Sequence, residues 1–100
     1  MARYSYLITM KTQLGERRGQ LWLECEQGLC QGVMTLLGTQ TRISGTLASD
    51  GRCQLQGLLC TLLRTIAYTA AGTLEPERLS LTLQAGSHSY PLDGKRKERA

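Results

Sequence analysis

The chain has 100 residues, about the size of a single domain, and a formal charge of +4 at neutral pH. Residues 95–100 hold four basic residues and one acidic residue, so residues 1–94 carry only +1. A nearly neutral domain in which only Arg17 and Arg18 adjoin is not expected to bind nucleic acid. The lack of a run of about 20 apolar residues argues against a membrane protein.

We therefore expect one domain at residues 1–94, followed by a disordered basic tail at residues 95–100. The first residues lack the apolar segment of a secretion signal, which predicts a cytoplasmic protein. Four cysteines in a reducing compartment are expected to be free thiols.

Between the glycines, apolar and polar residues alternate with a period of two, the pattern of half-buried strands. In chain order the alternation predicts strands at residues 4–12, 20–26, 29–37, 40–48, 52–60, 64–74, 79–85 and 88–93. The segments between them carry the Gly, Asp or Pro typical of hairpin turns. The sequence predicts an all-β, single-domain antiparallel meander of about eight strands that closes as a small barrel or a barrel-like sandwich.

The turns also predict which side chains face one another. A turn at Gly38–Thr39 would place Met34 opposite Ile43, and a first hairpin closing over residues 15–18 would place Lys11 beside Trp22. In four further predicted pairs a glycine faces a large aliphatic side chain: Leu23 and Gly32, Leu55 and Gly45, Ile43 and Gly57, Leu81 and Gly72. Small residues opposite large ones allow a strongly coiled sheet to close without overfilling its centre.

One segment also fits a helix. Between residues 58 and 71 the apolar residues form a helical stripe that would end at Gly72. The β-branched and aromatic residues of the same segment, such as Thr65, Ile66 and Tyr68, favour a strand. We expect a strand, and the alternative is an α+β fold with a helix near residues 58–71.

Four short glycine-aliphatic units recur along the meander: Gly32-Val33-Met34, Gly45-Thr46-Leu47, Gly57-Leu58-Leu59 and Gly72-Thr73-Leu74. Their spacing resembles the hairpin repeats of small up-and-down barrels of the calycin type. The resemblance covers nearly the whole meander and implies a barrel with a ligand cavity. A small apolar ligand inside such a barrel would have Tyr6, Tyr68 and Tyr90 near its mouth.

Catalytic and metal sites are not expected. The spacings Cys25-x4-Cys30 and Cys53-x6-Cys60 differ from those of zinc sites, and the only histidine, His88, lacks an acidic partner across the predicted turn. Cys25 and Cys30 flank a two-residue turn at a site where Cα atoms approach to about 4.5 Å, so a disulfide fits there geometrically. The sequence thus predicts a non-enzymatic protein without a cofactor.

Trp22 falls on the polar face of its predicted strand, opposite Val33, with Thr35 and Leu37 further along and Lys11 on its other side. Such a residue either covers a seam of the barrel or belongs to a contact patch. We interpret these five residues as an interaction patch, used to bind a protein or a second copy of the chain as a homodimer. The rival hypothesis is the carrier of a small apolar ligand.

Overall fold

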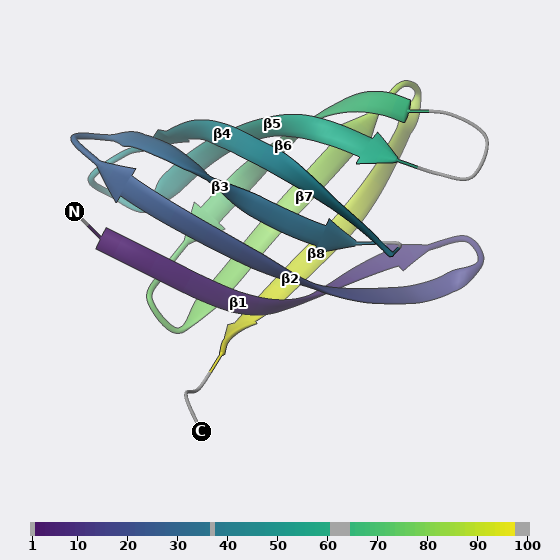
Figure 1. Ribbon diagram of the computed structural model, residues 1–100, viewed down its shortest axis with the longest axis horizontal. Helices are drawn as coiled ribbons and strands as arrows, with labels where there is room; N and C mark the ends of the chain where they lie inside the picture. The colour runs from purple at the N-terminus through teal and green to yellow at the C-terminus, as the bar shows by residue number, and fades with distance from the viewer. Residues whose placement is uncertain (1, 37, 61–64, 98–100) are drawn as a thin grey trace.

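The computed structural model describes residues 2–36, 38–60 and 65–97, and the regular structure in these ranges is entirely β-strand (Figure 1). The strands are β1 (Ala2–Thr12), β2 (Gly15–Glu26), β3 (Leu29–Leu36), β4 (Thr39–Leu47), β5 (Arg52–Cys60), β6 (Thr65–Leu74), β7 (Arg78–Ala85) and β8 (His88–Arg96). Each strand pairs antiparallel with the next, and β8 pairs with β1 to close the barrel. The predicted all-β fold is confirmed, and it closes as a barrel.

The strands are strongly tilted. A row of paired residues that starts at Ala2 passes through Cys25, Cys30, Gly45, Leu55, Ala70, Leu83 and Tyr90. Continued in the register of the β1–β8 pair, the row returns to β1 at Thr12 rather than at Ala2. This offset corresponds to a strand tilt of about 40°, and an eight-stranded barrel of that kind is just wide enough for side chains to fill its interior.

Buried side chains from all eight strands form one continuous cluster inside the barrel. Its most deeply buried large members are Tyr6, Ile8, Met10, Leu21, Leu23, Met34, Leu55, Leu79, Leu83 and Leu92. The alternative helix is wrong for residues 58–60 and 65–71, which lie in β5 and β6, while residues 61–64 fall outside the described ranges. Burial in this segment alternates with the period of two that is typical of a strand: Leu59 and Tyr68 are buried, whereas their neighbours Leu58 and Thr69 are exposed.

Inward-facing glycines sit where the neighbouring strand leaves no room for a Cβ. The four predicted glycine–aliphatic pairs are all present. A Cβ on Gly32 would lie 1.7 Å from the carbonyl oxygen of Trp22, and a Cβ on Gly45 would lie 1.9 Å from that of Gln54. The glycines are therefore required by the backbone of the neighbouring strand, and not only by the large side chain opposite them.

The predicted register of the β3–β4 pair is wrong, as is that of the β1–β2 pair described below. β3 ends at Leu36 and β4 begins at Thr39, with Gly38 at φ +73°, so Met34 faces Thr41 rather than Ile43. Moving the turn by one position shifted the register by two residues, which kept the same side chains inside.

The first hairpin turns earlier than predicted, at residues 13–14 rather than 15–18. The Thr12 hydroxyl accepts a hydrogen bond from the Leu14 amide and donates one to the Gly15 carbonyl, which stabilises the tight turn. The register of the whole β1–β2 pair follows from this turn.

The predicted tail begins too early. β8 continues to Arg96, where Lys95 pairs with Leu7 and Arg78, and Arg96 pairs with Tyr6. The expectation of disorder is thus wrong for Lys95 and Arg96, because their backbone completes the barrel. Residues 98–100 lie outside the described ranges.

Candidate interaction surface around Trp22

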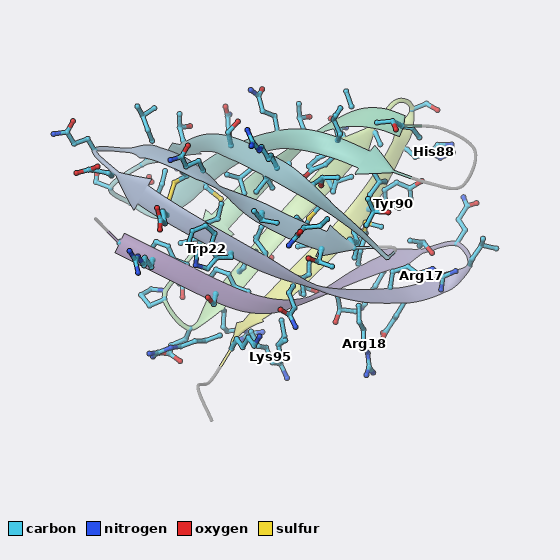
Figure 2. All side chains as sticks on the ribbon, viewed as in Figure 1. Arg17, Arg18, Trp22, His88, Tyr90 and Lys95 are labelled. Carbon is cyan, nitrogen blue, oxygen red and sulfur yellow. A yellow bond between two sulfur atoms is a disulfide. The ribbon has the colours of Figure 1, made fainter. Side chains whose placement is uncertain are left out.

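Trp22 points away from the core, as predicted. Leu21 and Leu23 on the same strand are buried, whereas Trp22 keeps 41% of its surface exposed (Figure 2). Its cross-strand partners on the outer face are Ser5 on β1 and Val33 on β3. Serine is too short to cover a neighbouring indole, which agrees with the partial exposure of Trp22.

Three hollows on the outside of the barrel meet at Trp22. A groove of about 910 Å³ runs across β2 to β7. A cleft of about 1770 Å³ lies where β1 begins, β8 ends and the β6–β7 turn crosses. A third hollow of about 310 Å³ is lined by Trp22, Val33, Gln20 and Thr35 among others. Among the residues that line these hollows, Trp22 alone belongs to all three.

Besides Glu24 and Arg42, the polar side chains that line the groove are uncharged. Cross-strand pairing aligns five of them in one row: Gln31, Ser44, Gln56, Thr69 and Gln84. Gly32 and Gly57 also line the groove. Because glycine lets a strand coil without a Cβ clash, such positions favour the curvature that hollows the outer face. The groove thus combines this polar row with apolar residues such as Leu58, and the Trp22 indole lines one end of it.

The lysine beside Trp22 is Lys97, not the predicted Lys11. The Lys97 amide donates to the Ser5 carbonyl at 2.9 Å, and its Nζ donates to Gln20 Oε1 at 3.2 Å. Lys97 thus reaches across Ser5 toward the residues around Trp22. Lys11 lies opposite Glu16, which is next to the first turn and six positions before Trp22 on β2.

The rest of the predicted patch is partly assembled. Val33 and Thr35 share the outer face of β3, with Thr35 opposite Gln20 in the third hollow. Leu37 lies outside the described residues. The structure therefore brings together Trp22, Val33 and Thr35, and the cationic member of the patch comes from the other end of the chain.

The cleft beside Trp22 is strongly basic, a feature that the sequence reasoning missed. We call it the basic cleft, and its cations are Arg3, Arg78, Lys95, Arg96 and Lys97. Glu77 is the one acidic residue that lines it. The signal was present in the sequence: beyond Tyr90 and Leu92 the alternation continues through Gly94, with Lys95 and Lys97 on the outer face.

The three tyrosines predicted at a ligand mouth do not gather at one opening. Tyr6 is buried, and its hydroxyl donates to the carbonyl of Glu75 in the β6–β7 turn. Tyr68 is also buried, with its hydroxyl 3.9 Å from the Met34 sulfur. Burial raises the pKa of both hydroxyls. Tyr90 instead stacks on His88, beside the turn at the opposite end of the barrel.

Cys25 and Cys30 form a disulfide, with their Cα atoms 4.1 Å apart (Figure 2). The prediction of free thiols is therefore wrong for this pair, although the predicted turn geometry that permits the bond is confirmed. Disulfides persist mainly in oxidising compartments, so the cytoplasmic location stays a prediction. Cys53 is a buried free thiol, and burial raises its pKa.

Within the described ranges, no group of three or more His, Cys, Asp or Glu side chains is arranged to hold a metal ion. The same residues include no helix long and apolar enough to cross a bilayer. Comparison of the chain with protein families, with curated proteins and with solved structures found no match in any of the three. The functional argument therefore depends on the geometry of the barrel itself.

Proposed function

We propose that this chain is a non-enzymatic binding protein that contacts a protein partner through the outer surface around Trp22. The observation that carries the proposal is the position of Trp22, half-exposed on the outer face at the junction of three hollows. Tryptophan is over-represented among the residues that dominate interface energies, typically near the centre of the interface.

The surroundings of Trp22 suit such a role. Val33 adds apolar surface beside the indole, and the amides and hydroxyls of the groove surround it with hydrogen-bonding groups. Protein interfaces commonly combine an apolar centre with a polar rim of this kind. The indole is 41% exposed and does not belong to the core. Its replacement therefore opens no core cavity, and the fold of the monomer does not depend on it.

A second candidate function is a calycin-type carrier of a small apolar ligand. The closed barrel of eight antiparallel strands favours it, because barrels of this size either fill with side chains or hold one small ligand. Two observations weigh against it: the buried side chains form one continuous cluster, and the tyrosines do not mark an entrance. Fluorescence titration with an apolar dye tests this candidate, which requires saturable binding with one dye per chain.

The main proposal is tested with Trp22→Gln, using Leu14→Gln as the control. Leu14 is 84% exposed in the first turn and lines none of the three hollows, so its replacement removes exposed apolar surface elsewhere. Partners are captured by cross-linking in an extract of the native cells, and self-association is followed by analytical ultracentrifugation. We expect Trp22→Gln to abolish an association that Leu14→Gln preserves.

Thermal unfolding of both variants separates binding from folding. Trp22→Gln should lower the free energy of unfolding by only about 1 kcal/mol, since the indole is not part of the core. Unchanged association in Trp22→Gln would refute the proposal. A loss of several kcal/mol would mean that the indole is structural.

A further inference from the structure

The basic cleft holds more positive charge than its ion pairs neutralise. Arg3 lies 3.4 Å from Glu24, and Arg96 lies 3.0 Å from Glu77. Three of these four side chains are more than half exposed, so both pairs are weak and can rearrange at little cost. Among the described residues no carboxylate pairs with Arg78, Lys95 or Lys97.

Two of the free cations face each other directly. Arg78 on β7 is paired across the strands with Lys95 on β8, and like charges in directly opposed positions destabilise a sheet. A bound anion would turn this repulsion into attraction. The arrangement is thus unfavourable for the isolated barrel and favourable for a complex with a negatively charged ligand.

The basic cleft is continuous with the third hollow, since Ser5, Trp22 and Lys97 line both. We propose that the basic cleft binds an acidic segment of the protein partner, whose carboxylates meet the cleft cations while one apolar side chain enters the hollow beside Trp22. This inference rests on the proposed function and specifies the chemistry of the partner. Arginine guanidinium groups suit carboxylates, which they bind through two parallel hydrogen bonds.

A second copy of the chain does not fit this cleft. In a two-fold symmetric dimer formed at this cleft, both sides of the interface would carry the same five cations, which would repel one another. The seven acidic residues among residues 1–94 come from β2, β8 and the turns after β4 and β6, so no single segment offers five carboxylates to match the five cations. The partner is therefore a different chain.

The cleft also differs from a nucleic-acid surface. Proteins that bind nucleic acids contact the phosphate backbone through extended stripes of cations on their surface. Here the five cleft cations cluster where β1 begins and β8 ends, and the adjoining hollow is lined by the neutral Gln20, Thr35 and Gln40 beside Lys97. Of the aromatic residues in the cleft, Tyr4 is stacked on Tyr6 and so has one ring face occupied. A short acidic segment matches this compact patch better than a polynucleotide does.

The test uses a fluorescein-labelled oligoglutamate peptide with one central leucine, followed by fluorescence anisotropy on the full chain. Its controls are the same peptide with glutamines in place of the glutamates, and a labelled oligothymidylate of equal charge. We expect the glutamate peptide to bind best, and added salt to weaken its binding. Absence of binding, equal binding of the glutamine peptide, or preference for oligothymidylate would each overturn the proposal.

Two double variants locate the binding. Arg78→Gln with Lys95→Gln removes the facing cations, and Arg17→Gln with Arg18→Gln removes the same charge near the first hairpin, away from Trp22 in Figure 2. We expect the first to weaken peptide binding about tenfold and the second less than about twofold. Equal losses would show non-specific attraction by net charge and overturn the proposal.

Folding and the proposed function are checked separately. The first double variant removes a repulsive pair, so its melting temperature should not fall; Lys97→Gln, which leaves that pair in place, provides a second test in the same cleft. If the peptide fails to bind while Trp22→Gln still abolishes partner capture, the acidic chemistry is wrong and the proposed function stands. If the peptide binds through Arg78 and Lys95 while Trp22→Gln captures the partner as well as the unaltered chain does, the proposed function fails.

Discussion

Gly32→Ala should strongly destabilise the barrel. The added Cβ would lie 1.7 Å from the Trp22 carbonyl oxygen and 2.9 Å from the Leu23 Cα, and both contacts are with backbone that no side-chain rotation can relieve. The first contact would have to open to at least 3.0 Å, which separates β2 from β3 at their pairing. Overpacking costs about 1–3 kcal/mol, and a weakened backbone hydrogen bond adds about 1 kcal/mol. We expect a loss of about 3 kcal/mol.

The measurement is urea denaturation, with Gly86→Ala as the control. Gly86 has φ +65° and open space at its Cβ position, so alanine there costs only backbone strain of about 1 kcal/mol. A loss of 3 kcal/mol in a domain of this size corresponds to a fall in melting temperature of roughly 12–24 °C. If Gly32→Ala were no more destabilising than Gly86→Ala, β2 and β3 would not be in the close contact on which the coiled barrel depends.

Three further predictions concern ionisation, thiols and the chain end. Burial raises the pKa of Tyr6 and Tyr68, so the folded chain keeps protons that the unfolded chain loses. Their contribution to the free energy of unfolding should be constant below the unfolded pKa of about 10 and fall as pH rises above it, so the fall should be shallower in Tyr68→Phe; a flat profile to pH 11 in urea titrations would contradict this. The buried Cys53 thiol, whose pKa is also raised, adds a fall of the same sign in both proteins. Alkylation of the unfolded, unreduced chain followed by mass spectrometry should leave Cys25 and Cys30 unmodified, and four alkylated thiols would disprove the disulfide. Deleting residues 95–100 should lower the melting temperature by several degrees, because Lys95 and Arg96 pair with β1 and β7; an unchanged melting temperature would contradict this pairing.

The faces of the strands could be predicted because they depend on local signals. Alternation with a period of two assigns each side chain to the inside or the outside, and a turn shifted by one position moves the register by two, which preserves the face. The pairing of Met34 changed for this reason without Met34 leaving the core. The outward direction of Trp22 was predictable on the same grounds.

The basic cleft was not predictable in the same way, because it depends on which residues from the two ends of the chain become neighbours. Lys97 reaches Ser5 only through closure of β8 onto β1, and Lys11 moves away from Trp22 because of the hydrogen bonds that Thr12 makes in the first turn. The charge of the last residues also suggested a frayed terminus, although the alternation through Leu92 and Gly94 continues the strand. The prediction of a tail gave the charge of these residues more weight than the alternation that continues into them.

Because β8 is hydrogen-bonded to β1, the barrel cannot close until β8 has left the ribosome. Until then β1 exposes an unpaired edge, and the nascent sheet exposes the apolar face that will become the interior. The contact that completes the fold joins residues separated by nearly the full length of the sequence, which makes closure a slow, late event by loop entropy. A circular permutant that links the two ends and opens the chain at the β4–β5 turn would make this pairing a local hairpin, and we expect it to fold faster than the natural order.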